Sequence, residues 1–322
     1  AFEDDSQTSR APISQSTYYL LSNNTYYQES TMSSSPYHAE LELAKSAALK
    51  AGEIIRKYSG NSGRSNNSAV VCVKSGVDLV TEADTHVERV VTQIIKAAFP
   101  EDDIVGEEDQ VEFPKGRQDD PFPTGRICKL LIDSAYNFIS IYPVDPIDGT
   151  TNFVHNYPFV AISIGFIVST RQQREVELEH FSMVNQQELI VTPPTSVEDC
   201  LLVNNIGHCR RDDFIDESTD RVNKWLRANL RGYRSSGSAA QNLAHVASGQ
   251  VSCYYEHGYG GPWDVCAGIV LVKEAGGVVW DARDGTDLQM RFGKGSVCAG
   301  GKRVVEDVLR VAGKPTTTFS KG

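Results

Sequence analysis

Strand-like apolar runs alternate along this chain with segments in which apolar residues recur at helical spacing. The helical pattern is clear in residues 38–58 and 83–98, and it returns in the second half of the chain. The second-half segments are residues 219–230, 238–249, 264–277 and 303–313. The strand-like runs are AVVCVK (69–74), KLLID (129–133), FISIY (138–142), FVAISIGFIV (159–168), ELIV (188–191), CLLVNN (200–205), VSCYYE (251–256) and VVW (278–280). Strands interleaved with helices predict an α/β fold of the α+β layered kind, in which helices cover the faces of sheets.

The 322 residues suffice for a sizeable core, in one large domain or in two halves in close contact. Residues 1–36 are rich in Ser, Thr, Asn, Gln and Tyr, lack periodicity, and predict a disordered tail. We expect an N-terminal α+β half over residues 37–193, a C-terminal α/β half over 194–314, and a short tail over 315–322. Met32 lies just before the first helix, and a native start at this methionine is a hypothesis that N-terminal sequencing would test.

Charge and cysteine content limit the partners of the chain. The net charge of −11 argues against a nucleic acid or an anionic membrane surface, because both bind basic faces. The sequence has no run of 18 apolar residues and so predicts no transmembrane helix. The seven cysteines are scattered singly, which is typical of reduced cytoplasmic thiols. The sequence therefore predicts a cytoplasmic protein, and a small phosphorylated substrate stays open if a metal ion offsets its charge.

The segment YPVDPIDGTTNF (142–153) places Asp145 and Asp148 in what we interpret as a loop after an apolar strand. Gly149 and the polar residues after it are typical of a helix start, whose free N–H groups suit a phosphate. Carboxylates repel phosphate, but they bind Mg²⁺, which shares its oxygen ligands with substrate phosphates. The ordinary alternative is an Asx-turn followed by a capped helix, without a metal.

Further acidic residues lie at the ends of other expected elements. Glu107 and Glu108 follow a short apolar strand, and Asp264 begins an apolar helix. Each of them, taken alone, is explained as a surface acid or a helix N-cap. Together with Asp145 and Asp148 they match what a two-metal phosphatase site needs, because such a site draws carboxylates from separate segments.

Two longer segments resemble the signature motifs of the inositol monophosphatase family. They are DPIDGTTNFVHNYPF (145–159) and WDVCAGIVLVKEAGG (263–277). The family's other landmarks are similar, in the same order, to DLVTEAD (78–84), GEE (106–108) and RSSGSAAQNLAHVASG (234–249). The resemblance runs from about His38 to the C-terminal helix, and it implies the αβαβα sandwich of the inositol monophosphatases and sugar phosphatases.

The resemblance implies Mg²⁺-dependent hydrolysis of inositol monophosphate by an enzyme with two or three ions per site, and many members of the family are lithium-sensitive. By position, Glu107, Asp145 and the backbone carbonyl of Ile147 would hold one ion. Asp145, Asp148 and Asp264 would hold a second, and Glu107 would help to hold a third. Such ions lower the pKa of a bound water and stabilise the departing alkoxide.

The same resemblance assigns roles around the substrate, a small phosphorylated polyol. Glu107 and Thr150 would orient or deprotonate the attacking water, and the N–H groups of Gly149 and Thr150 would cradle the phosphate. Glu256 would accept hydrogen bonds from ring hydroxyls. The remaining substrate contacts implied are Ile147, Asp148, Gly237, Ser238, Ala239 and Asp264.

Lys74 and Asp78 fall where the family has a loop beside the metals. The resemblance leaves two roles open for them. They would position water or the third ion, or they would form an ordinary pair that faces solvent.

The chain departs from the family pattern in two places. The segment between Glu107 and Asp145 is longer than in typical relatives, and a glycine-rich hairpin after Val191 is missing. Neither change removes a proposed ligand, but both bear on the sheet edge and on the homodimer that the resemblance implies. Because related enzymes act on other esters, a phosphatase of a sugar phosphate, histidinol phosphate or nucleotide 3′-phosphate is an alternative. The two length changes leave a non-catalytic scaffold of the same fold as a further alternative.

Overall fold

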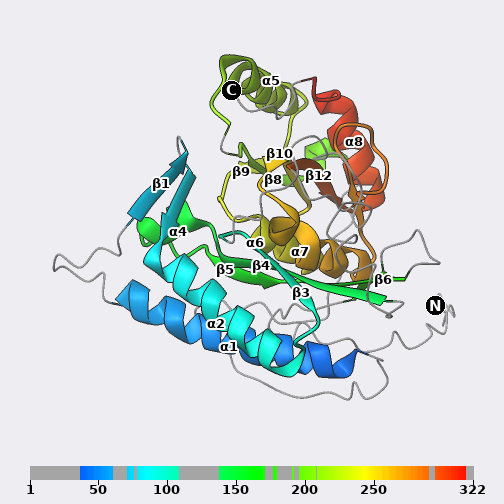
Figure 1. Ribbon diagram of the computed structural model, residues 1–322. Helices are drawn as coiled ribbons and strands as arrows, with labels where there is room; N and C mark the ends of the chain where they lie inside the picture. The colour runs from blue at the N-terminus through cyan, green and yellow to red at the C-terminus, as the bar shows by residue number, and fades with distance from the viewer. Residues whose placement is uncertain are drawn as a thin grey trace, which may run out of the picture.

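The computed structural model describes residues 37–60, 71–75, 78–108, 138–170, 177–179, 191, 196–207, 209–289 and 294–316 (Figure 1). The tail expected over residues 1–36, the KLLID run, and the first three residues of ELIV lie outside these described residues. Within them, no helix is long and apolar enough to cross a membrane.

Two sheets alternate with three pairs of helices through the described part of the molecule, as Figure 1 shows from bottom to top. The pairs are α1 (His38–Gly60) with α2 (Glu82–Ala98), α6 (Ala239–Ala247) with α7 (Pro262–Glu274), and α5 (Asp212–Arg227) with α8 (Lys302–Ala312). The first pair covers one face of the first sheet, the second pair lies between the sheets, and the third packs on the outer face of the second sheet. This αβαβα order confirms the layered fold expected from the sequence.

The first sheet is built around one long central strand, β4. Its members are β3 (Asp103–Gly106), β4 (Phe138–Asp148), β5 (Ala161–Ile164), β6 (Phe166–Thr170) and β7 (Glu177–Glu179). Strand β3 runs parallel to β4, whereas β6 and β5 run antiparallel to the first and last parts of β4. The run FVAISIGFIV, expected as one strand, is therefore two strands that meet at Gly165.

A hairpin leads from the first helix into the second. Strands β1 (Val71–Ser75) and β2 (Asp78–Thr81) pair antiparallel, and Thr81 then caps α2. The Asp84 carboxylate accepts a hydrogen bond from Thr81 N at 2.9 Å, while Thr81 Oγ1 accepts one from Ala83 N at 3.2 Å. This reciprocal capping box explains why DLVTEAD changes from strand to helix at its threonine.

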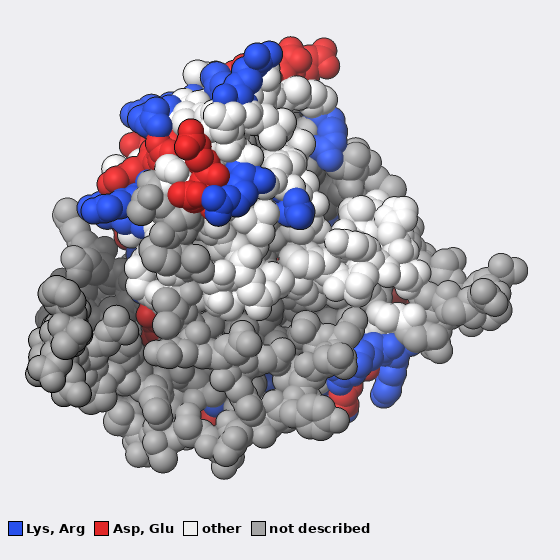
Figure 2. All heavy atoms as spheres, turned by 180° about the vertical axis from the view of Figure 1, so that it is seen from behind, with Lys and Arg blue, Asp and Glu red and all other residues white. Residues whose placement is uncertain are grey.

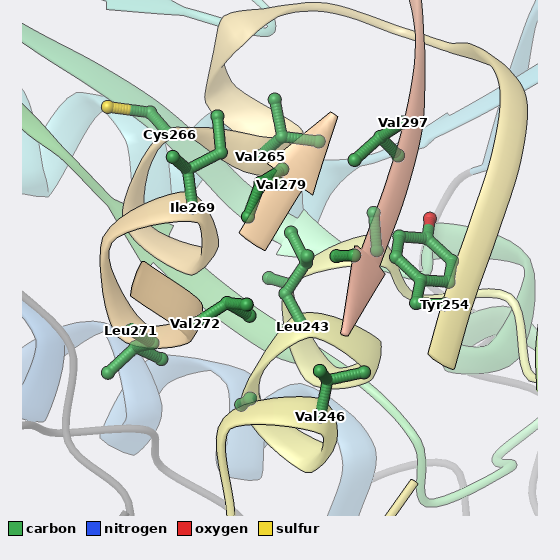
Figure 3. Close-up of a cluster of buried hydrophobic side chains, with 14 of the residues drawn as sticks. Leu243, Val246, Tyr254, Val265, Cys266, Ile269, Leu271, Val272, Val279 and Val297 are labelled. Carbon is green, nitrogen blue, oxygen red and sulfur yellow. The ribbon is translucent and has the colours of Figure 1, made fainter. Parts of the chain in front are cut away.

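The middle layer is the main hydrophobic core. Helix α7 buries apolar residues around most of its circumference, as expected for a helix that lies between two sheets. Figure 3 shows side chains of α6 and α7 packed against residues of the second sheet. The labelled examples are Leu243 and Val246 of α6, Val265, Cys266, Ile269, Leu271 and Val272 of α7, and Tyr254, Val279 and Val297 of the sheet.

The second sheet has the order β11–β12–β10–β8–β9. Its strands are β8 (Leu201–Asn205), β9 (Gly232–Arg234), β10 (Cys253–Tyr259), β11 (Val278–Trp280) and β12 (Gly295–Gly300). Strands β10, β8 and β9 are mutually parallel, whereas β12 runs antiparallel to β10 and to β11. Strand β12 was not among the expected strands, although it is buried along its whole length.

The outer helices carry a mixed charge. Trp225 of α5 donates from Nε1 to Val308 O of α8 at 3.0 Å, which joins the two helices. Figure 2 shows positive and negative side chains intermixed at the end of the molecule that these helices form. Exposed ion pairs such as Lys224–Asp220 (2.8 Å) lie there, and pairs of this kind contribute little stability.

A short 3₁₀ turn, η1 (Val197–Asp199), lies beside α8.

Candidate active site

Both aspartates of the DPIDG segment lie in the last part of β4, which corrects the loop expected from the sequence. Pairing with β5 matches Asp145 with Ser163 and Asp148 with Ala161, and the register shifts between these pairs. A proline is tolerated at such an irregularity because it has no N–H to donate to the ladder. Pro146 fits this position, and both carboxylates are buried there.

The Asp148 carboxylate lies against the N-terminus of α6. Its Oδ2 accepts hydrogen bonds from Ser238 Oγ at 2.7 Å and Ala240 N at 2.5 Å, and its Oδ1 accepts one from Ala239 N at 3.2 Å. The free N–H groups of a helix start favour a negative charge. Burial nevertheless raises the pKa of Asp148 to about 7, against the effect of these hydrogen bonds. The structure thus brings Ser238 and Ala239, expected on the substrate side, into direct contact with an expected metal ligand.

Asp145 is 2% exposed, and its Oδ1 has no hydrogen-bond partner among the described residues. Burial raises the pKa of Asp145 well above its usual range, and the negative charges of Glu107, Asp148 and Asp264 raise it further. A buried polar atom without a partner costs about 1–3 kcal/mol. The chemistry of this position therefore calls for a donor or a cation.

Asp264 joins the same cluster from the first turn of α7. Its Oδ2 accepts a hydrogen bond from Gly260 N at 2.6 Å. Burial raises the pKa of Asp264 well above its usual range, and the charges of Asp148, Glu107 and Glu256 add to the rise. Two buried carboxylates of β4 and the half-buried carboxylate of Asp264 thus repel one another.

Glu107 follows β3, and its backbone fixes it beside the aspartates. Its N–H donates to Val144 O of β4 at 3.1 Å. Lys74 of β1 lies 3.1 Å from Glu107 Oε1 and 2.7 Å from Glu108 Oε1, measured from Nζ. Burial works against the charge of Lys74, but the two glutamates outweigh it and raise the pKa of the lysine. Burial also raises the pKa of Glu108 to about 7. Lys74 is therefore an exposed residue whose ammonium group forms ion pairs with both glutamates.

Thr150 is the first residue of the short helix α4 (Thr150–Val154), directly after Gly149. Gly149 has a φ of +95°, and a Cβ there would lie 3.0 Å from Phe159 O, so the turn requires glycine. Gly149 is the N-cap of α4, and no side chain caps the first turn of this helix. The Thr150 hydroxyl lies 3.2 Å from Ile147 O and 3.4 Å from Asp84 Oδ1.

Asp84 is a site residue that sequence reasoning missed. It is fully buried, and its pKa is raised by burial and by the charge of Glu107. The DLVTEAD segment was noted as a landmark, but nothing in its spacing shows contact with a threonine 66 positions later. Asp78, the other candidate in that segment, is described only in its backbone as part of β2.

The expected alcohol side is formed by β10 and by the turn before α6. Glu256 of β10 is buried, accepts hydrogen bonds from Tyr254 Oη and Asn205 Nδ2, and has a pKa raised by burial. The turn at Gly237 has a φ of +83°, and Asn152 of α4 donates to Ser236 O there at 2.7 Å. A hydrogen bond therefore joins α4, whose start carries the expected phosphate contacts, to the turn on the expected alcohol side.

The donor set fits a hard divalent cation in its chemistry. In the described residues no three His, Cys, Asp or Glu side chains converge closely enough to hold a metal as they stand. The physical reason is visible: α6 satisfies Asp148, Gly260 satisfies Asp264, and Lys74 satisfies Glu107. The unpartnered Asp145 oxygen and the mutually raised pKa values are what a cation would relieve. Oxygen ligands of this kind suit Mg²⁺, provided that Glu107 turns away from Lys74.

Fold and site together define a class of protein, an αβαβα sandwich with buried carboxylates where the first sheet meets α6 and α7. Residues 38–313 match the model of the inositol monophosphatase family. An inositol monophosphatase of Mesembryanthemum crystallinum is 36% identical over 75% of this chain and 84% of its own length. Human inositol monophosphatase 1 is 32% identical over 80% of this chain and 88% of its own length.

Solved structures agree on the fold. The extragenic suppressor protein suhB from Bartonella henselae superposes with a TM-score of 0.62 at 24% identity, over 86% of this chain and 99% of that chain. An inositol monophosphatase from Anabaena gives a TM-score of 0.57 at 27% identity, over 86% and 96%. The chain belongs to the inositol monophosphatase family, and it is an enzyme of the phosphoric monoester hydrolase class.

Proposed function

We propose that this enzyme hydrolyses inositol monophosphate to inositol and phosphate, with Mg²⁺ as its cofactor. The observation that supports this most is the clustering of the buried Asp145 and Asp148 with the half-buried Asp264, because the charges of Asp148 and Asp264 raise the pKa of Asp145 and the charge of Asp148 raises that of Asp264. A phosphate dianion cannot approach such a cluster unless cations offset its charge. The names of the relatives support inositol monophosphate as the substrate.

In this proposal Glu107, Asp145, Asp148, Asp264 and the carbonyl of Ile147 hold two or three Mg²⁺ ions. When bound, the ions supply positive charge for the phosphate and the departing alkoxide and lower the pKa of the attacking water. Hydrogen bonds from the N-terminus of α6 hold Asp148 in its position beside Asp145.

The residues of the chain orient the attacking water and the phosphate. The Thr150 hydroxyl, held between Ile147 O and Asp84, accepts a hydrogen bond from the water. Asp84 or Glu107 takes the proton that the water loses, since both are carboxylates close to that hydroxyl or to Asp145. The backbone N–H groups of Gly149 and Thr150 hold the phosphate oxygens.

The alcohol part of the substrate lies beside Gly237, Ser238, Ala239 and Glu256. A buried carboxylate that already accepts two hydrogen bonds has lone pairs left for ring hydroxyls. We further propose a homodimer in the cytoplasm that acts on a small phosphorylated polyol and not on nucleic acid or membrane. Sugar phosphates, histidinol phosphate and nucleotide 3′-phosphates are the alternative substrates.

Phosphate release tests the proposal. The substrates are myo-inositol 1-phosphate and a panel of the alternative esters, with Mg²⁺ and with EDTA. Glu107→Gln should lower turnover by about 100-fold or more, because it removes a ligand and a base. Glu198→Gln, the same change at an exposed glutamate, should leave turnover unchanged. No turnover of any ester by folded protein with Mg²⁺ would overturn the proposed function.

A further inference from the structure

Asn205, the last residue of β8, connects the two segments on the expected alcohol side. Parallel pairing of β8 with β10 places Asn205 in register with Glu256. Its Nδ2 lies 3.3 Å from Glu256 Oε2 and 3.5 Å from Tyr254 Oη. Its Oδ1 accepts hydrogen bonds from Gly237 N at 3.1 Å and from Ser236 N at 3.4 Å.

The amide of Asn205 can take only one orientation in this network. Backbone N–H groups need an acceptor, and the Glu256 carboxylate needs a donor. Each end of the amide therefore has a partner that the other end cannot serve. Neither Asp nor an aliphatic residue reproduces both contacts.

The hydrogen bond from Asn205 also affects the pKa of Glu256. Glu256 is 6% exposed, and its pKa is raised by burial and lowered by its bonds to Tyr254 and Asn205. A buried carboxylate is costly unless donors surround it. The asparagine thus supplies one of the donors that this buried carboxylate needs and holds the carboxylate in place for ligand hydroxyls.

Asn205 also holds one side of the turn that leads into α6. Asn152 of α4 holds the carbonyl of Ser236 from the phosphate side, at 2.7 Å, and Asn205 holds the N–H groups of the same turn from the alcohol side. The next residues, Ser238 and Ala239, donate to Asp148. The turn therefore links Glu256, through Asn205, to Asp148, so it fixes how far apart these two carboxylates lie.

We propose that Asn205 is a positioning residue for substrate specificity. It fixes Glu256 against the Ser236–Gly237 turn so that the carboxylate accepts hydrogen bonds from adjacent hydroxyl groups of a cyclic polyol phosphate. This inference rests on the proposed function and specifies how its alcohol side discriminates between esters.

The test compares two esters in two matched variants. Asn205→Asp keeps the Oδ1 acceptor and the side-chain size but loses the N–H donor to Glu256. Asn204→Asp is the control, because Asn204 is also buried and its Nδ2 donates to Tyr233 Oη at 3.1 Å, away from Glu256. The esters are myo-inositol 1-phosphate and phenyl phosphate, whose alcohol has no further hydroxyl groups.

We expect Asn205→Asp to raise the KM for myo-inositol 1-phosphate by about 10-fold or more, the size typical of a lost hydrogen bond to a charged group. The kcat and KM for phenyl phosphate should change by less than about 2-fold, a ratio that a general loss of structure would not produce. Asn204→Asp should leave the ratio between the two esters unchanged. Equal effects of Asn205→Asp on both esters, or no effect on either, would overturn the inference.

Two further measurements separate the inference from other failures. Should Asn205→Asp not fold, as judged by thermal unfolding, Asn205→Ser gives the same comparison without an added charge. If the wild-type chain hydrolyses neither ester, the proposed function fails, and calorimetric binding of myo-inositol 1-phosphate with Mg²⁺ then tests Asn205 alone. Binding that Asn205→Asp weakens about 10-fold supports the positioning role, whereas equal or absent binding overturns it.

Discussion

Asp145 concentrates the conflict between stability and function at a single residue. Its carboxylate is buried at the end of β4, one oxygen has no partner among the described residues, and three acidic neighbours raise its pKa. Ordinary folding physics disfavours such a group, because burial of a charge needs compensation by donors or opposite charge. The proposed metal-binding role would account for a carboxylate at this position.

We therefore predict that Asp145→Asn stabilises the metal-free protein. Removing the charge should raise the free energy of unfolding in EDTA by about 1–3 kcal/mol, since repulsion by Asp148 and Asp264 disappears. Urea denaturation followed by circular dichroism measures the change. Asp213→Asn, at an exposed aspartate paired with Arg211, is the control and should not stabilise. A less stable Asp145→Asn in EDTA would contradict this reading of the site.

At the scale of elements, the β1–β2 hairpin places the ammonium group of Lys74 beside the carboxylates of Glu107 and Glu108, which follow β3. Lys74 lies within 3.1 Å of Glu107 and within 2.7 Å of Glu108. If Glu107 binds a metal ion as proposed, Lys74 would compete with that ion for the Glu107 carboxylate. The ion pair between Lys74 and Glu107 should therefore weaken Mg²⁺ binding, and bound Mg²⁺ should weaken the ion pair.

Lys74→Met should bind Mg²⁺ about 5-fold more tightly than the wild-type chain, because a positive charge beside the site is removed. Isothermal titration calorimetry measures the affinity without reference to turnover. Lys50→Met removes an equivalent charge from an exposed pair with Glu53 on α1 and should leave the affinity unchanged. Weaker binding by Lys74→Met would show that the lysine supports the metal site instead of competing with it.

The elements also show how far sequence reasoning reaches. Helical periodicity predicted α1, α2, α6, α7 and α8 because each has an apolar face or an apolar circumference that the sequence displays. Strand β12 was missed, since GSVCAG is short and bounded by glycines and only its tertiary position makes it a buried strand. We expected a loop at Asp145, whereas the register shift lets β4 continue past Pro146.

The residues of the candidate site were likewise predicted only in part. Motif resemblance named residues that the structure does bring together, such as Asp148 with Ser238 and Ala239. Asp84 and Asn205 were missed because their contacts join residues far apart in the chain, and neither has a local pattern that reports such a contact.

At the scale of the whole molecule, the αβαβα layering brings acidic side chains from different layers to one place. Asp145 and Asp148 come from the first sheet, Asp264 from the middle helices and Glu256 from the second sheet. Their charges act on one another, so the stability of the molecule should depend on pH and on metal.

The sign of that dependence follows from raised pKa values. Burial raises the pKa of Asp148 to about 7 in the folded protein, compared with about 3.9 in an unfolded chain. Between about pH 4 and pH 7 the folded state binds more protons, so stability in EDTA should fall as pH rises through this window. Urea midpoints at pH 5 and pH 7.5 measure this, and Mg²⁺ should raise the midpoint more at pH 7.5. A midpoint in EDTA that is higher at pH 7.5 than at pH 5 would contradict the prediction.

The most direct test of the metal-dependent site is phosphate release from myo-inositol 1-phosphate as Mg²⁺ is titrated into metal-free wild-type and Asp145→Asn protein. We predict turnover that rises from zero with Mg²⁺ in the wild type and is at least about 100-fold lower in Asp145→Asn at saturation. Turnover by the wild type in EDTA, or full turnover by Asp145→Asn, would contradict the assignment of the buried carboxylates as the metal site.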